Sequence, residues 1–455
     1  MFRVLFGLVA TYGSLRFLAK GWVDTLYLTP AHHLTYAGLG WVRPLPAPWM
    51  HAHLALLAVL GLCIAAGYRY RLATVAFALG FAYIELIDAA LYLNHYWYVT
   101  LTAAALAVLP LHRHCSLDAR AGRVAASATL PAIVLWVLRG QIGVVYLFAG
   151  IAKLNGDWLF EALPLRLWLA DSAHLPLIGS LLAMSWVAYA ASWAGALFDC
   201  TIVAWLSWRR SRPAAYAAVI VFHTLTGLLF RIGIFPVVMI AATLVFFPPD
   251  WPSRLRRRAC ARIPGGRTEA SRRAEAANQP APVQSGAGRV GSASSAGGAD
   301  GQRWRWALAI LSLVALLQVA IPLRHLAYPG NVRWTEEGYY LSWRVMITEK
   351  AGHLEFRVTD AGGAEWQVGP ELVLTDWQAT QAAIRPDLLV TTAHLLADHY
   401  RAAGRGEVEV RADAFVSFNG RPHRRIVDPT VDLASVPRNL APKPYLLPLD
   451  PSARS

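Results

Sequence analysis

The stretch YLFAGIAKLNGDW (residues 146–158) ends a long apolar segment at a single lysine, Lys153, and only then turns polar. A lysine at the end of a span most often extends its ammonium group to the lipid headgroups. Gly150, just before it, would allow a second helix to approach closely. The stretch therefore indicates a membrane-spanning helix and leaves open whether its lysine is an anchor or a base.

The composition of the whole chain agrees with a membrane protein. Of its 455 residues 56% are hydrophobic and only 15% are charged, whereas soluble proteins are roughly 25% charged. About eight or nine spans of some 20 apolar residues are expected. We place them at residues 4–20, 52–67, 72–90, 97–111, 127–151, 177–206, 214–230, 233–248 and 304–321.

Arginine clusters between the spans predict the topology. They follow every second span, at residues 68–71, 112–123, 208–212 and 254–262. The positive-inside rule places these loops and the N-terminus in the cytoplasm, and everything beyond residue 322 outside. Asn94, His95 and Lys153 then share the outer side. The net charge of +14 is explained by topology, so we expect no nucleic-acid partner.

The predicted fold is a polytopic α-helical membrane bundle followed by an extramembrane, β-rich α+β domain. We expect four segments: a helical catalytic membrane domain, an arginine-rich and then disordered cytoplasmic linker, the last span, and the outer domain. They cover residues 1–250, 251–303, 304–322 and 323–455.

Local patterns predict the elements of the outer domain. Residues 338–347 and 353–360 alternate like strands, and residues 407–420 return to strand. Residues 375–401 have helical periodicity that is broken at Pro386.

Further stretches carry a family resemblance that runs along nearly the whole chain. They are RPLPAPWM (43–50), IDAALYLNHYWY (87–98), RHCSLD (113–118), FHTLTGLLFRIGIFPVVM (222–239), YPGNVRWTEEGYYLSWRVMI (328–347) and VSFNGRPHRRIVDPTVDL (416–433). With residues 146–158, the chain resembles the vitamin K-dependent γ-glutamyl carboxylase family, as a bacterial-type homologue with an HTTM-like membrane domain.

The resemblance implies an activity and its cofactors. Members of this family use vitamin K hydroquinone, here menaquinol or phylloquinol, with O2 and CO2 and no metal. They convert glutamate of a protein or peptide to γ-carboxyglutamate and release the quinone epoxide. Lys153 matches the family lysine that deprotonates the hydroquinone, and desolvation near the hydrocarbon would favour its neutral amine. Asn94 and His95 match the pair expected to hydrogen-bond the quinone oxygens.

Other residues are weaker candidates for the cofactor or substrate site. Asp88, His223 and Arg231 are predicted to bind the cofactor; the alternatives are hydrogen bonds within the bundle for the first two and headgroup anchoring for Arg231. A second group is expected to face the glutamate substrate, with strand packing as the alternative: Trp334, Tyr339, Trp343 and Arg344. The histidines and cysteine of residues 112–118 lie among arginines, and no metal site is expected there.

The expected partners are a glutamate-containing protein, membrane lipids and a reductase that regenerates the quinol. The expected location is a bacterial inner membrane, with the outer domain in the periplasm. Two other functions stay open. One is a membrane oxidoreductase that epoxidises quinol without carboxylating protein, and the other is a non-catalytic protein that binds quinones or lipids.

Overall fold

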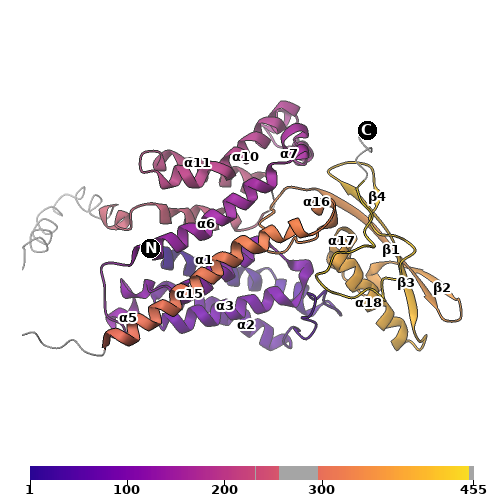
Figure 1. Ribbon diagram of the computed structural model, residues 1–455, viewed down its shortest axis with the longest axis horizontal. Helices are drawn as coiled ribbons and strands as arrows, with labels where there is room; N and C mark the ends of the chain where they lie inside the picture. Colours follow the sequence, from indigo (N-terminus) through magenta and orange to yellow (C-terminus); the bar gives the residue numbers. More distant parts are fainter. Residues whose placement is uncertain (231, 256–295, 450–455) are drawn as a thin grey trace, which may run out of the picture.

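A computed structural model describes residues 1–230, 232–255 and 296–449. Arg231, a predicted cofactor-binding residue, lies outside the described residues. Most of the linker, for which we predict disorder, also lies outside them. Long helices lie side by side in one bundle, and the sheet with its two helices forms a second unit at one end of that bundle (Figure 1).

Long helices form the bundle, as the apolar spans predict. They are α1 (Phe2–Ala19), α2 (Ala47–Ala66), α3 (Tyr70–Ile87), α4 (Asn94–Val108), α6 (Ala132–Lys153), α10 (Ser185–Ser207), α11 (Arg212–Leu229), α12 (Phe235–Thr243) and α15 (Ala296–Leu323). Seven helices of the described chain are long and apolar enough to cross a membrane. The chain is an integral membrane protein, and its predicted fold class is confirmed.

Two expected spans are shorter than a bilayer requires. α4 has 15 residues, and the apolar helix Phe235–Phe246 comprises α12 and a 3-10 turn, η4 (Leu244–Phe246). A 15-residue helix is about 22 Å long, against roughly 30 Å of hydrocarbon. The span expected over residues 177–206 begins only with α10, because short helices precede it: α7 (Gly156–Glu161), α8 (Leu165–Asp171) and α9 (Gly179–Leu182).

The closest helix pair, α1 and α2, meets at two glycines. A Cβ atom added to Gly61 would lie 2.5 Å from Thr11 Oγ1 and 2.9 Å from Gly7 O. Thr11 Oγ1 also donates a hydrogen bond to Ala58 O at 3.2 Å. Since lipid is as apolar as leucine, such close contact between small residues is what holds these helices together.

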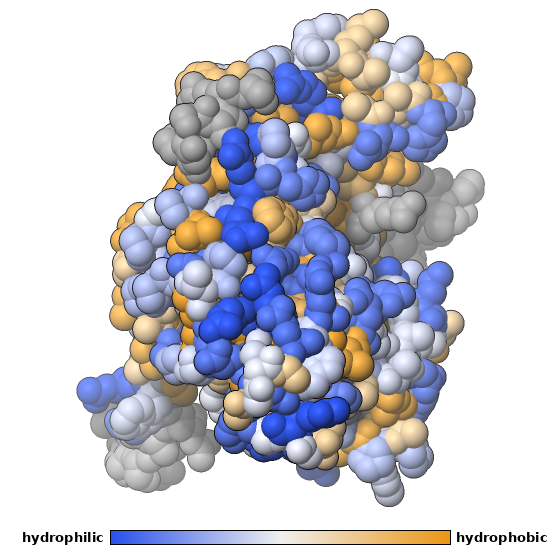
Figure 2. Space-filling model, turned by 90° about the vertical axis from the view of Figure 1, so that its right-hand side faces the viewer, coloured by the Kyte–Doolittle hydropathy of each residue, from blue (hydrophilic) through white to orange (hydrophobic). Residues whose placement is uncertain are grey.

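The outer domain is an antiparallel sheet covered by two helices. Its strands, in the order β2-β1-β3-β4, are β1 (Lys350–Asp360), β2 (Glu365–Val368), β3 (Val408–Phe418) and β4 (Arg424–Arg425). Alternate residues such as Phe356 and Ala412, which are partners in register, are buried. The surface that this domain presents is mostly hydrophilic (Figure 2).

The predicted helical segment of the outer domain is confirmed, including its break. α17 (Asp376–Ile384) and α18 (Pro386–Ala402) are separated at Arg385, which has extended backbone angles. Pro386 begins α18, where its missing N–H is harmless. Thr375 and Gln378 form a capping box at the start of α17.

The strand predicted over residues 338–347 is wrong. Leu341, Trp343 and Met346 have φ angles of 58°, 57° and 52°, in the left-handed region that a β-strand does not visit. The chain therefore folds into successive turns, and burial does not follow the alternation of apolar and polar residues: Ser342, Trp343 and Arg344 are buried one after another. This loop leads from α16 (Val332–Thr335) to β1.

The two ends of the bundle differ as the charge pattern predicts. At one end, Arg3 donates to Cys115 O at 2.8 Å and Asp118 accepts from the backbone of Arg69 and Tyr70, so the arginine-rich loops at residues 68–71 and 112–123 lie together. At the other end the outer domain is attached. The compartment that each end faces stays a prediction.

We predict that Gly61→Ala weakens the bundle. The added methyl group meets backbone atoms of α1 that cannot move aside, which should cost about 1–3 kcal/mol. The measurement is the melting temperature of a fluorescent fusion in detergent by size-exclusion chromatography. Gly140→Ala on α6 is the matched control, because nothing lies within 4 Å of its added Cβ. Equal melting temperatures for the two variants would contradict the packing described.

Candidate active site

Lys153, the last residue of α6, is turned into the protein. Its Nζ lies 2.8 Å from Asp199 Oδ2 on α10 and also donates to Ala149 O at 3.3 Å. The side chains of Lys153 and Asp199 are only 8% and 6% exposed, and the ring of Trp158 lies 5.2 Å from Nζ. An anchoring lysine would extend into solvent, so this geometry does not fit the anchor alternative.

Gly150 makes this ion pair possible. A Cβ atom at Gly150 would lie 2.7 Å from Cys200 Sγ and 2.9 Å from the Cys200 backbone N. α6 and α10 therefore approach as closely as backbones can, as the sequence predicts. Positions three apart share a helix face, so the same close contact brings Asp199 within reach of Lys153.

The pair can hold a proton on either partner. Moving a proton from Nζ to the Asp199 carboxylate leaves two neutral groups, and no isolated charge is stranded in an apolar interior. Sequence reasoning considered the burial of Lys153 and missed Asp199. The signal was present, since Asp199 is the one acidic residue within the apolar sequence of α10.

His95 and His223 both lie near the ring of Phe235. The centroid of Phe235 is 5.5 Å from the His95 ring and 5.9 Å from the His223 ring. His223 Nε2 is 2.8 Å from Tyr146 OH, and Nδ1 of the same ring has no partner. Because Tyr146 is on α6, about two turns before Lys153, the helix that carries the lysine also contacts this cluster.

Asn94 and Asp88 lie where the bundle meets the outer domain. Asn94 Oδ1 accepts a hydrogen bond from Tyr92 OH at 2.8 Å, and this hydroxyl accepts one from the Leu341 backbone. Asp88 Oδ2 accepts from Gln378 at 2.7 Å and lies 3.2 Å from His33 Nδ1. Its Oδ1 accepts from Ala90 N at 2.8 Å. Hydrogen-bond donors of the protein thus occupy both Asp88 oxygens. This geometry fits a structural role for Asp88 better than the predicted role in cofactor binding.

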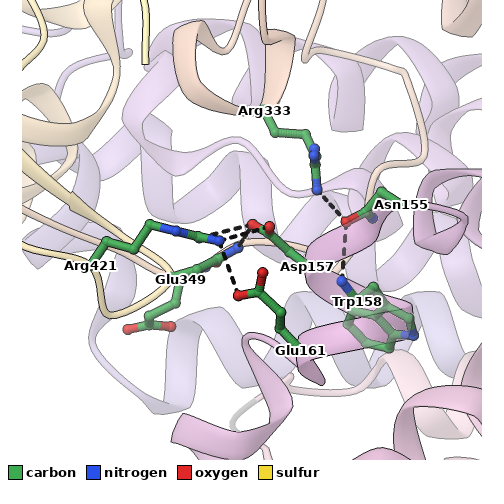
Figure 3. Close-up of polar contacts among 8 residues, drawn as sticks. Asn155, Asp157, Trp158, Glu161, Arg333, Glu349 and Arg421 are labelled. Atoms are coloured by element: carbon green, nitrogen blue, oxygen red, sulfur yellow. Dashed lines mark hydrogen bonds and ion pairs between the residues drawn. The ribbon is translucent and has the colours of Figure 1, made fainter. Parts of the chain in front are cut away.

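A polar cluster attaches the chain immediately after Lys153 to the outer domain (Figure 3). Arg421 binds Asp157 through two hydrogen bonds of 2.9 and 3.0 Å, and Asn419 Nδ2 donates to the same carboxylate at 2.7 Å. Arg333 donates to Asn155, whose side chain also caps α7. The outer domain thereby fixes the backbone that follows the lysine.

A cavity of about 670 Å³ lies between the bundle end and the outer domain. Its membrane half is largely aromatic, and its outer half is largely charged. The membrane half includes Phe17, Trp22, Tyr27, Glu85, Tyr96 and Trp97; the outer half includes Arg333, Glu336, Tyr339, Arg344, Glu349, Lys350 and Arg385.

Of the four predicted substrate residues, two line the cavity and two are buried elsewhere. Tyr339 and Arg344 line its wall. Trp334 is fully buried in the outer-domain core, where its indole donates to Leu447 O at 2.8 Å, and Trp343 is buried against the bundle. Both tryptophans therefore pack in the protein interior, which was the alternative to facing the substrate. Lys153 is not a wall residue; it adjoins the wall through Asn155 and Arg333.

Three guanidinium groups in the wall, those of Arg333, Arg344 and Arg385, have no acidic partner among the described residues, and the last two are buried. Arg344 and Arg385 are 9% and 6% exposed, and no carboxylate of the described residues lies within 4.0 Å of their nitrogens. Arg344 donates to Glu337 O at 3.0 Å and Arg385 to Ala89 O at 2.9 Å, while Arg385 Nε has no partner. Two buried cations with spare donors favour an anion. No pattern in the sequence marked Arg385, because its neighbours in space come from distant segments.

Comparison with known families agrees with this architecture. Residues 1–251 match the HTTM domain, and residues 303–452 match the lumenal domain of vitamin K-dependent gamma-carboxylase. The chain belongs to the vitamin K-dependent gamma-carboxylase family. The predicted family is thus confirmed, and the family's name carries the dependence on vitamin K. No solved structure matches the chain significantly.

We predict an acid-labile contact between the two parts of this gamma-carboxylase family member. Burial alone would raise the pKa of Asp157, but hydrogen bonds from Arg421 and Asn419 outweigh it and hold this pKa below its ordinary value. The stabilisation is therefore complete above the ordinary carboxyl pKa of about 3.9 and is lost as the pH falls through the folded-state pKa. Melting temperatures from pH 7 to pH 3 should fall less steeply in Asp157→Asn than in the wild type.

The control for this pH series replaces an arginine that is exposed. Arg421→Gln should lower the melting temperature at pH 7, whereas Arg424→Gln, close by in the sequence and exposed, should leave both the temperature and its pH dependence unchanged. Identical pH profiles for the wild type and Asp157→Asn would show that this contact contributes nothing.

We predict strong coupling between Lys153 and Asp199. Lys153→Met or Asp199→Leu alone strands one buried charge and should cost about 3–5 kcal/mol. The double variant replaces the pair with apolar groups and should recover most of that loss. Melting temperatures of the four proteins form the cycle. Additive effects of the two substitutions would mean that the groups do not interact.

Proposed function

We propose that this chain carboxylates glutamate residues of a protein or peptide, using vitamin K hydroquinone, O2 and CO2, and releases the quinone epoxide. The observation that carries the proposal is the two-part cavity. An aromatic half at the membrane adjoins an outer half with two buried, unpaired guanidinium groups, and a buried lysine is attached to its wall. A lipid-soluble ring and an acidic side chain would meet there.

The membrane half would receive the two-ring quinol. The whole cavity, of about 670 Å³, has the volume typical of small-molecule sites, and Tyr27, Tyr96 and Trp97 offer flat apolar surface for the ring. When bound, the hydroquinone supplies the electrons with which O2 is converted into a base strong enough to remove the γ-proton of glutamate. The chain's own residues bind, orient and exchange protons around this chemistry.

The outer half fits the acidic substrate. Arg344 and Arg385 would bind the side-chain carboxylate of glutamate, since planar guanidinium groups match carboxylates well. Tyr339, in the outer half of the wall, packs against Tyr92 with 5.5 Å between ring centroids and would help to orient the substrate. Glu336 is already paired with Lys350 at 2.6 Å, so this carboxylate does not neutralise Arg344 or Arg385; Arg333, the third arginine of the wall, donates to the Asn155 amide.

Lys153 would act as the base toward the quinol. Its neutral amine would accept a proton at Nζ, and Asp199 would stabilise the ammonium that results. Asn94 and His95 would hydrogen-bond the quinol oxygens. Lys153, Asn94 and His95 are not among the residues that line the cavity, so this role requires contacts that tighten when substrate is bound, as catalytic contacts commonly do.

The active end should face the outside of a bacterial inner membrane. The arginine-rich loops at residues 68–71 and 112–123 meet at the opposite end of the bundle, and the positive-inside rule assigns that end to the cytoplasm. Protein substrates would then be carboxylated after export, and a separate reductase would return the epoxide to quinol.

The decisive experiment measures both products in the same tubes. Purified protein receives vitamin K hydroquinone, O2, labelled CO2 and a short glutamyl peptide. We expect labelled peptide and quinone epoxide from the wild type, and a loss of both by about 100-fold or more in Lys153→Ala, the usual range for removing a general base. Lys20→Ala, which changes an exposed lysine at the end of α1, is the control and should keep full activity.

Each other outcome contradicts a defined part of the proposal. Epoxide without labelled peptide would indicate a quinol-epoxidising oxidoreductase. Neither product, from folded protein offered several quinols and peptides, would indicate a non-catalytic binding protein. Activity that survives in Lys153→Ala would remove the lysine from the mechanism.

A further inference from the structure

The first half of strand β1 has a free edge. All 11 residues of β1 are in register with β3, but only residues 356–359 are in register with β2. β2 ends at Val368, and Pro370, which has no N–H to continue a ladder, follows two residues later. Residues 350–355 therefore have no strand on the β2 side within the part of the chain that the structure describes.

The register with β3 determines which backbone groups face this edge. In an antiparallel sheet, successive residues direct their N–H and C=O groups alternately to one neighbouring strand and to the other. Asn419 N donates to Glu349 O at 2.8 Å on the β3 side. Lys350, Gly352 and Leu354 therefore direct their backbone groups to the free edge, where no described residue forms a backbone hydrogen bond with them.

The free edge is accessible. Residues 351–353 are exposed. Helix α17 packs on one face of the strand, since a Cβ atom added to Gly352 would lie 2.6 Å from Ala383 O and side chains of a strand point to the faces of its sheet. This contact leaves the edge itself open. Exposed backbone groups along a strand edge are a template on which another extended chain can pair.

The edge begins at the cavity. Residues 346–350 belong to the wall of the cavity. Two buried arginines lie close to the start of the edge: burial lowers the pKa of Lys350, the ion pair with Glu336 opposes this effect, and the positive charges of Arg344 and Arg385 add to it. An extended chain that pairs with the edge would thus enter the cavity beside these two guanidinium groups.

We propose that the edge of β1 from Lys350 to Leu354 binds an extended segment of the polypeptide substrate as an added strand, and so guides a glutamate into the outer half of the cavity. The inference rests on the proposed function and identifies its substrate as an extended chain that carries the glutamate. Main-chain hydrogen bonds provide affinity whatever the sequence. The edge would therefore accept many sequences, while Arg344 and Arg385 would select the acidic side chain.

The first test removes single hydrogen-bond donors from the peptide. The probe is a fluorescent seven-residue peptide with one central glutamate among threonines and valines, bound to the full chain in detergent and followed by fluorescence anisotropy. Each backbone N–H is replaced in turn by N–CH3. We expect the affinity to fall by about tenfold at every second position. The positions between, whose amides face away from β1, are matched controls and should change little.

The second test locates the bound peptide. Amide hydrogen exchange of the full chain is measured with and without a saturating concentration of the probe peptide, and exchange should slow at residues 350–354. The outer edge of β2 (Glu365–Val368) is the control, because it also ends the sheet but does not line the cavity. Its exchange should stay unchanged.

The outcomes separate this inference from the proposed function. Losses of affinity without a period of two, or slower exchange at β2 and not at residues 350–354, would overturn the added strand and leave the proposed carboxylation standing. So would a probe peptide that is carboxylated although it leaves the exchange of residues 350–354 unchanged. A probe peptide that is neither bound nor carboxylated would count against both.

Discussion

The attachment of the outer domain to one end of the bundle is the contact on which the rest of this structure depends. It is made by polar groups that find partners across the boundary: Arg421 on Asp157, Gln378 on Asp88 and Arg385 on the Ala89 backbone. Because these partners lie at the rim, an unfilled space remains between the two surfaces. One side of that space is lined by apolar side chains of the bundle, and the other side carries charged side chains of the outer domain.

Close helix packing carries the chemistry within the bundle. Hydrophobic burial cannot hold helices together in lipid, so contact depends on small residues. At Gly150 that contact does more than stabilise, because it brings a carboxylate on α10 to the lysine at the end of α6. Neither charged group could stay buried alone at acceptable cost. The lysine, the aspartate and the glycine therefore form one unit.

Local patterns in the sequence predicted much of this fold. Apolar runs located the long helices, alternation located β1 and β3, and Pro386 marked the break between α17 and α18. The loop over residues 338–347 was mistaken for a strand, because its letters alternate between apolar and polar although its backbone makes left-handed turns and buries three successive residues, Ser342 to Arg344. The roles of Asp199 and Arg385 could not be predicted in this way. Each depends on a contact with a residue far along the chain, and no local periodicity indicates which residue that is.

The outer domain follows the bundle through a single connection, the helix α15 and the turn η5 (Arg324–Ala327). Its attachment is thus an intramolecular equilibrium, governed by an effective concentration that short connections raise to about the millimolar range. Rim contacts that would be too weak to hold two separate proteins together can keep this interface closed. The two walls of the cavity thus belong to one chain, and the fit between them does not depend on the concentration of the protein.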